Sequence, residues 1–284
     1  MQANRGIDHI VHCVRDLDAA IGRLQALGFT VTPRALHPFG TGNALVQMQG
    51  CFIELLTIVE PGKIAPAAGG GFGFGPFCRD YLARREGMAM LVFESHDAHA
   101  DRADFIAADL TTYPVFDFSR KAELPGGGEA TVAFSLAFVT HGDMPQAAFF
   151  TCQQHAPEHF WKPEYQSHAN GAQEIAEIIM VADEPGEWRA FFEGMQGAGS
   201  ARLDGDLLCV ATARGKVTVM TQGAFAARFP GETAPPDRQG PVFAAAIIRV
   251  ADVDALAGNP LTADGSPFVP ASQAFGLVLG FVGP

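Results

Sequence analysis

The sequence predicts an α+β fold built from repeated strand-and-helix modules. Four segments each begin with an apolar strand and continue into a helical stretch and further strands. Repetition of this kind indicates a structure assembled from similar units, each of which buries its apolar face against its neighbours. The four segments start near Gly6, Gly87, Gln173 and Gly240.

The first module combines a strand over residues 7–14 with a capped amphipathic helix. Because side chains alternate between the faces of a strand, His9 and His12 are expected on opposite faces. Asp16 can accept the hydrogen bond that caps the following helix, and Gly28 can end it. The apolar stripe of this helix should cover the face of His12, which leaves His9 on the other face.

The second module places a helix over residues 97–110 between apolar strands. A glycine- and proline-rich run over 61–76 precedes it and has too few side chains to pack as an element, so it is expected to be a crossover loop. Residues 125–128 are expected to form a hairpin turn. The strands of this module are predicted at 88–93, 113–121, 130–139 and 147–155.

The second half of the chain repeats the pattern with less polar detail. The third module has a strand near 175–181, a helix around Trp188 and strands at 207–212 and 216–221. The fourth has a strand at 242–250, a short helix at 252–257 and a final strand at 275–282. The sharpest boundary lies near Gly171, so we expect domains over residues 1–170 and 171–284.

A carboxylate stands inside the apolar strand over residues 51–56. Burying Glu54 there without a partner would cost several kcal/mol. The sequence leaves several partners open: a bound metal, Arg34, Arg79 or a backbone amide.

The first half of the chain resembles a domain of the vicinal oxygen chelate superfamily, which includes glyoxalase I, extradiol dioxygenases and bleomycin-resistance proteins. The resemblance rests on the strand with His9, the helix ending in Leu27-Gly28-Phe29, and the strand with Ile53-Glu54-Leu55. Residues 149–158, 161–165 and 168–172 are similar to the glyoxalase-like branch of that superfamily. The resemblance implies βαβββ modules paired into two curled sheets that enclose cavities, with the second half a degenerate copy.

The resemblance also implies that His9 and Glu54 hold a divalent metal and take part in catalysis. Two further ligands usually come from the second module, but Met88 or Met90 stands at one of those positions, and methionine is a poor ligand for such a metal. On the last strand of that module, His155 and Gln153 are the available groups, and they are expected to complete a site for Zn²⁺, Fe²⁺, Mn²⁺ or Ni²⁺.

Four other residues are candidates for binding substrate. His37 is either a loop histidine or a residue at the cavity rim, and Asn43 either a turn residue or an amide contact. The aromatic segment over residues 158–165 is either a cavity lid or a domain-packing element, and within it Trp161 and Tyr165 are the candidate contacts.

Composition limits the class of partner. The chain has 284 residues, 48% of them apolar, and a formal net charge of −12, which argues against nucleic-acid and anionic-membrane surfaces. Residues 1–5 contain no apolar signal core, and no later segment approaches about 18 uninterrupted apolar residues, so we expect neither export nor membrane spanning. Five cysteines without a CxxC pair suggest reduced thiols and a cytoplasmic location.

These observations favour a cytoplasmic metal-dependent enzyme that acts on a small oxygen-bearing substrate. Lyase or isomerase chemistry is preferred to ring-cleaving oxygenation, which would need iron held by His9, His155 and Glu54. The alternative from another class is a metal-free protein that binds or sequesters small molecules. Relatives of this kind build their sites within one chain or across a dimer, so a homodimer is among the expectations.

Overall fold

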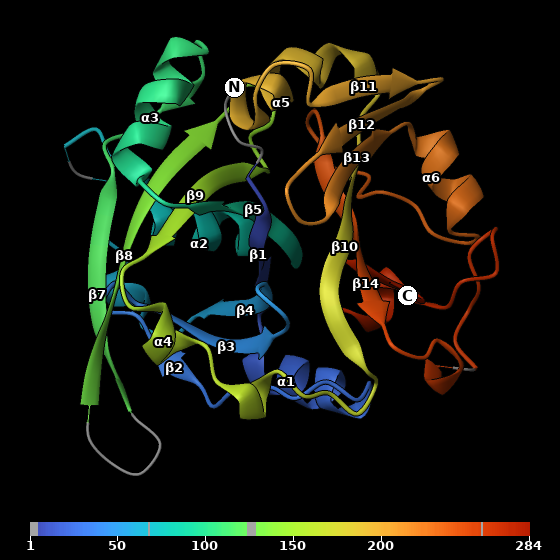
Figure 1. Cartoon of the computed structure of the whole chain (residues 1–284), viewed down its shortest axis with the longest axis horizontal. Coiled ribbons are helices and arrows are strands. Elements are labelled where there is room, and N and C mark those ends of the chain that lie inside the picture. The colour runs from blue at the N-terminus through green and yellow to red at the C-terminus, as the bar shows by residue number, and fades with distance from the viewer. Residues whose placement is uncertain (1–4, 68, 124–128, 257) are drawn as a thin grey trace.

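The chain folds into two mixed β-sheets that lie side by side (Figure 1). The computed structural model describes residues 5–67, 69–123, 129–256 and 258–284. The expected turn at 125–128 lies outside them. Within the described residues no helix has the length and apolarity needed to cross a membrane. The strands of the first sheet are β1 (Ile7–Cys13), β2 (Ala35–Leu36), β3 (Thr41–Gln47), β4 (Phe52–Ile58), β5 (Gly87–Ser95), β6 (Thr111–Thr112), β7 (Phe116–Glu123), β8 (Glu129–Thr140) and β9 (Ala148–Gln154).

The second sheet is formed by the remaining part of the chain, and short helices connect the strands of both sheets. Its strands are β10 (Ala172–Val181), β11 (Ala201–Asp204), β12 (Leu207–Ala211), β13 (Lys216–Met220), β14 (Val242–Val250), β15 (Phe268–Val269) and β16 (Val278–Val282). The α-helices are α1 (Leu17–Ala26), α2 (Phe74–Arg84), α3 (Ala98–Ala107), α4 (Pro157–Phe160), α5 (Arg189–Gln196) and α6 (Gln222–Arg228). The 3₁₀ helices are η1 (Pro61–Lys63), η2 (Pro163–Tyr165), η3 (Pro185–Trp188), η4 (Asp254–Leu256) and η5 (Ala271–Gln273).

Strand pairing confirms the predicted α+β fold of paired modules. The first sheet has the order β2-β3-β4-β1-β5-β9-β8-β6, with β7 paired to β8. In its centre, β1 runs parallel to β4 and antiparallel to β5, so the first strands of modules one and two are joined. The second sheet, β11-β12-β13-β10-β14-β16-β15, joins modules three and four in the same way.

Several elements differ from the sequence prediction. The run over 61–76 is not wholly a loop, because its last residues begin α2. The helix α6 was not predicted from the sequence. A short helix was expected over 252–257, and the described residues of that range contain the 3₁₀ helix η4 instead. These are short or glycine-rich segments in which tertiary packing outweighs local propensity.

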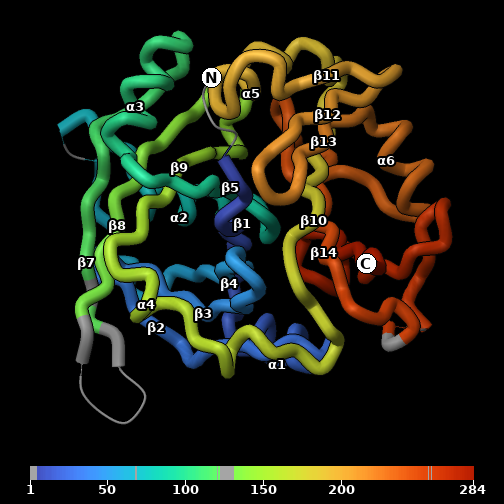
Figure 2. The backbone as a smooth tube through the Cα atoms, viewed as in Figure 1, coloured from blue at the N-terminus to red at the C-terminus, as the bar shows by residue number. Residues whose placement is uncertain are grey.

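One of three buried apolar clusters among the described residues lies between the sheets. Ile10 of β1, Leu24 of α1 and Ile178 of β10 belong to the same buried cluster, and Phe149 of β9 packs against Phe243 of β14 with ring centroids 5.5 Å apart. One face of each sheet therefore meets the other half of the molecule. Figure 2 shows the backbone of β1 and β5 beside that of β10 and β14. The first sheet ends with β9 at Gln154 and the second begins with β10 at Ala172, while the division into domains at residue 170 stays a prediction.

His12 links the two halves through this buried face, as its place in the alternation of β1 predicted. Its Nε2 lies 2.9 Å from the carbonyl oxygen of Phe275, a residue with a φ of +52°. Burial lowers the pKa of His12, although the hydrogen bond to Phe275 and the charge of Glu86 act in the opposite direction. The neutral imidazole can donate Nε2–H to the carbonyl, so the folded state needs no proton on Nδ1.

The buried His12 should make stability fall in acid. Its pKa is lower in the folded state than the usual value of about 6.5, so the unfolded chain takes up a proton that the folded chain does not. Stability is then lost as the pH falls below about 6.5, by up to about 1.4 kcal/mol per pH unit for one proton. Urea unfolding at pH 7.5 and pH 5.5 should show a smaller loss for His12→Gln than for the unaltered protein. His168, whose pKa is also lowered by burial, provides the comparison through His168→Gln. An acid dependence unchanged in His12→Gln would contradict this role.

Candidate active site

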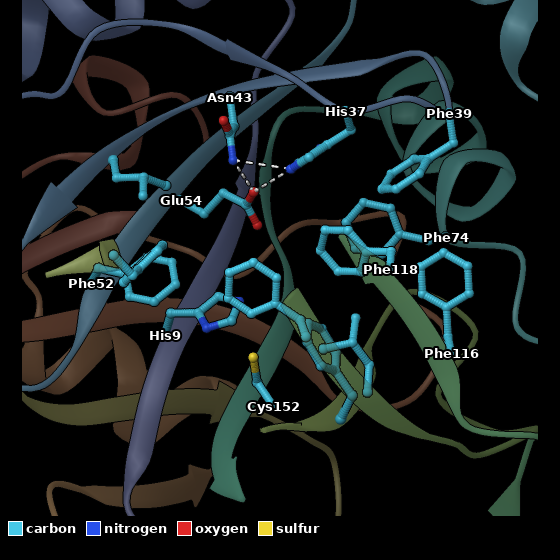
Figure 3. Close-up of a pocket in the computed structure, with 15 residues that line it drawn as sticks. His9, His37, Phe39, Asn43, Phe52, Glu54, Phe74, Phe116, Phe118 and Cys152 are labelled. Atoms are coloured by element: carbon cyan, nitrogen blue, oxygen red, sulfur yellow. Dashed lines mark hydrogen bonds and ion pairs between the residues drawn. The ribbon is translucent and has the colours of Figure 1, made fainter. Parts of the chain in front are cut away.

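A small aromatic cavity lies on the face of the first sheet that points away from the shared core. Its volume is about 60 Å³. For comparison, an apolar cavity of about 150 Å³ accommodates benzene. In its present form it can therefore hold a group of only a few heavy atoms. The side chains that line it are drawn in Figure 3: His9, His37, Phe39, Asn43, Leu45, Phe52, Glu54, Phe74, Phe116, Phe118, Phe134, Leu136, Phe150, Cys152 and Phe160.

Glu54 is the carboxylate of this cavity. It stands on β4 opposite Val11 of β1 and Leu45 of β3, and only 6% of its surface is exposed. Asn43 Nδ2 donates a hydrogen bond of 2.5 Å to Glu54 Oε1. His37 Nε2 lies 3.9 Å from the same oxygen. The predicted need for a partner is thus met by an amide and an imidazole. The arginines among the candidates pair elsewhere, Arg34 with Asp18 and Arg79 with Asp80.

The hydrogen bonds around His37 indicate its tautomer. Its Nδ1 lies 2.8 Å from Thr41 Oγ1, and its Nε2 lies 3.3 Å from Asn43 Nδ2. An amide NH₂ group can only donate, so this contact requires an unprotonated Nε2 and places the imidazole proton on Nδ1. His37 thus places Nε2 next to the Asn43 amide and 3.9 Å from Glu54 Oε1. His37 was expected to be either a loop histidine or a rim residue, and it lines the cavity. Asn43 is not a turn residue, because it lies within β3.

His9 faces the same cavity and is held by an aspartate that the sequence analysis missed. His9 Nδ1 and Asp8 Oδ1 are 2.5 Å apart, and Asp8 Oδ2 accepts a hydrogen bond from Gln154. Regular alternation would put Asp8 and His9 on opposite faces, but the pairing of β1 with β5 shifts register between Ile7 and His9. Such a bulge turns adjacent side chains toward one side. Phe52 stacks on the imidazole with ring centroids 4.1 Å apart, which fixes its plane.

Cys152 contributes a protonated thiol to the cavity wall. Burial raises its pKa well above the usual value, and the charges of Asp8 and Glu54 raise it further. The thiolate is the form that binds metals and attacks electrophiles. Cys152 consequently acts here as a small apolar group.

The two metal ligands expected from the end of β9 do not reach the cavity. Gln153 accepts a hydrogen bond from the backbone of Ala98 at the start of α3 and donates one to the carbonyl of His96. His155 is exposed, and its Nε2 lies 2.8 Å from Ser135 Oγ. The expected strand face was wrong, because β9 presents its even-numbered residues, Phe150 and Cys152, to the cavity.

The aromatic segment after β9 covers one side of the cavity through a different residue from those expected. Phe160 lines the cavity directly. Trp161 packs behind it, with its ring 5.1 Å from that of Phe160 and 5.8 Å from that of Phe52. Tyr165 lies beside a neighbouring pocket and does not line the cavity. The segment is thus part of the wall, and its two predicted contacts stand one layer further out.

These donors do not fit a divalent metal held by three protein ligands. The described residues contain no group of three His, Cys, Asp or Glu side chains placed to share an ion. His9 is oriented by a carboxylate as metal-binding histidines often are, and Glu54 lies on the same face. His155 and Gln153 lie elsewhere, and His37, which lines the cavity beside Glu54, does not form with His9 and Glu54 a group of described side chains placed to share an ion. The four-ligand set and the iron triad of a ring-cleaving oxygenase are therefore not assembled by these residues.

Comparison with known proteins identifies the family. The model of the glyoxalase-like domain matches residues 7–195, which is more than half of the chain. The protein belongs to the glyoxalase-like domain family. The match includes the whole first sheet and continues through β10 and most of α5. It confirms the resemblance to the vicinal oxygen chelate superfamily that His9, Glu54 and the intervening helix indicated.

Solved structures agree with this membership at the level of the fold. A hypothetical protein from Staphylococcus aureus matches with a TM-score of 0.68 and 14% identity, covering 98% of this chain and 99% of its own. A variant of 4-hydroxymandelate synthase from Streptomyces coelicolor has a TM-score of 0.57 and 12% identity, with 99% and 92% covered. The Mn(II)-bound glyoxalase from Novosphingobium aromaticivorans has a TM-score of 0.53 and 12% identity, with 100% and 83% covered. No curated protein matches the sequence significantly.

Metal addition provides a test of the donor set in this glyoxalase-like protein. A ligand present at a hundred times its dissociation constant would raise the free energy of unfolding by about 2.7 kcal/mol. Because the described residues contain no group of three His, Cys, Asp or Glu side chains placed to share an ion, we expect Mn²⁺ or Zn²⁺ at micromolar concentrations to give no such rise in urea unfolding of chelator-treated protein.

The variants His9→Ala and Glu54→Gln serve as matched controls for this experiment. Stoichiometric metal in untagged protein, measured by elemental analysis and lost in both variants, would contradict our conclusion about the donors.

Proposed function

We propose that the first cavity is the active site of an isomerase or lyase that moves a proton on a small oxygen-bearing substrate. The observation that supports this most is the buried Glu54 carboxylate, which faces the cavity beside the amide of Asn43 and the imidazole of His37. A buried carboxylate that faces a cavity, with an amide and an imidazole beside it, is placed to act as a general base on a bound substrate.

The Asp8–His9 pair supplies the complementary group. Asp8 accepts Nδ1–H and stabilises an imidazolium if His9 takes up a proton, so Nε2 remains for a substrate oxygen. With His9 in the imidazolium form, Glu54 would remove a proton from the carbon next to a carbonyl, while His9 Nε2–H donates a hydrogen bond to the oxygen on which negative charge develops. Asn43 and His37 would hold the carboxylate of Glu54 in position.

The second candidate is a protein that binds a small molecule without turning it over. Its support is the aromatic lining, which is typical of ligand sites. The cavity volume of about 60 Å³ argues against drug-sized ligands unless the phenylalanine walls move. The paired acid and base groups favour the enzyme.

Proton exchange can test this proposal without knowledge of the natural substrate. We expect the protein to speed the exchange of the protons next to the carbonyl of 4-oxopentanoate with D₂O, followed by proton NMR. Glu54→Gln should slow the catalysed exchange by about 100-fold or more, since general-base catalysis contributes about that factor. Asp8→Asn should slow it less, because it leaves His9 in place without the charge of its partner.

The control is Glu60→Gln, which removes an exposed carboxylate that pairs with Lys63 outside the cavity. It should leave the exchange rate unchanged. Binding of 4-oxopentanoate without any catalysed exchange would favour the binding protein and reject the enzyme. Exchange that survives in Glu54→Gln would reject Glu54 as the base.

A further inference from the structure

A second, larger pocket adjoins the cavity and shares part of its wall. It has a volume of about 340 Å³. Asn43, Leu45 and Phe160 line both spaces. A molecule whose small end reached Glu54 would therefore have its remaining atoms next to this pocket, which we call the vestibule.

The vestibule is basic in an otherwise acidic protein. Arg34, Lys121, His159 and Lys162 line it, and no Asp or Glu does so among the described residues. Two of the four lysines of the chain thus gather at one pocket, although the formal net charge of the protein is −12. A concave surface lined by charges of one sign concentrates ligands of the opposite sign.

Nearby carboxylates reduce this charge only in part. Arg34 forms an exposed ion pair with Asp18, and His159 Nε2 lies 4.0 Å from Glu158 Oε1. The ammonium group of Lys162 lies 5.9 Å from the centre of the Tyr165 ring, and an aromatic face leaves the charge of a cation intact. The inference rests on the sign of the lining charges rather than on any one of them being unpaired.

Asn43 offers a polar contact where the two spaces meet. Its side chain is buried, with 4% of the residue exposed, and its Oδ1 has no hydrogen-bond partner among the described residues. Its Nδ2 is directed to Glu54, so the oxygen points away from the carboxylate (Figure 3). A buried amide oxygen without a hydrogen-bond donor destabilises the folded protein, because the bond to water that it lost is not replaced. A hydroxyl or amide of a bound molecule would supply that donor.

We propose that the vestibule binds the anionic group of the substrate, a carboxylate or a phosphate, while an uncharged carbonyl-bearing end enters the cavity. The proposal rests on the proposed function for the direction of binding. Charge dictates that direction, because an anionic end beside Glu54 and Asp8 would be repelled, whereas in the vestibule it meets cations. Size dictates it too, since a cavity of about 60 Å³ accepts only the small end.

Binding of matched charged and neutral probes tests this proposal. The reporter is the fluorescence of Trp161, which packs on Phe160, in a Trp188→Phe variant where it is the sole tryptophan. We expect 6-oxoheptanoate to bind about tenfold more tightly than its methyl ester, as one charge-assisted contact allows. Dihydroxyacetone phosphate against dihydroxyacetone provides the phosphate arm. Added NaCl should reduce both preferences, because salt screens exposed charges.

Lysine variants assign the preference to the vestibule. Lys162→Met and Lys121→Met should each weaken binding of the anions by about threefold to fivefold and leave the ester unchanged. Lys63→Met is the matched control, since it removes the same charge from an exposed lysine that lines neither space. It should change neither affinity.

The outcomes separate this proposal from the proposed function. Equal affinity for acid and ester, no binding of either series, or equal losses in Lys63→Met and Lys162→Met would overturn the anion site. A lysine-dependent preference for the anions without any proton exchange would support the anion site and reject the enzyme. Glu54-dependent proton exchange without any preference for the anions would support the enzyme and reject the anion site.

Discussion

The two-sided burial of β1 is the constraint on which both the fold and the site depend. This strand is bonded to β4 on one side and to β5 on the other, so its backbone leaves no free edge. One of its faces packs into the core shared with the second sheet, and the opposite face forms the floor of the cavity. His9 can point to the cavity only because Ile10 and Val14 are fixed in the core, and a slip by one residue would exchange these faces.

This constraint explains what the sequence could predict about the site. Alternation along β1 and the isolated carboxylate on β4 place His9 and Glu54 on one face, and the same alternation sends His12 to the other half. The contact between Asp8 and His9 was not predicted, because the bulge that brings them together depends on the pairing with β5 rather than on the local sequence. For His37 the sequence left a loop residue and a rim residue as alternatives, since its contact with Glu54 depends on how β2, β3 and β4 align.

The end of the second module could not be predicted in the same way. The strand β9 is apolar on both faces, so its sequence alone does not say which residues meet the cavity. By analogy with metal sites, Gln153 and His155 were expected on the face of β9 that lines the cavity. In the structure both residues bond elsewhere, and the opposite face lines the cavity. Glycine-rich segments and short helices such as α6 were missed for a related reason, because contacts distant in sequence stabilise them.

A buried carboxylate in the second half shows what distinguishes Glu54. Glu177 on β10 takes the place in that sheet that His9 has in the first, and it is as deeply buried as Glu54. Burial alone would raise the pKa of Glu177, but a hydrogen bond and the charge of Arg228, with Thr218 and Lys216, lower it overall. A carboxylate held in the ionised form by fixed cations is a structural ion pair and a poor proton acceptor. Glu54 has an amide and an imidazole in the places where Glu177 has a guanidinium and an ammonium group.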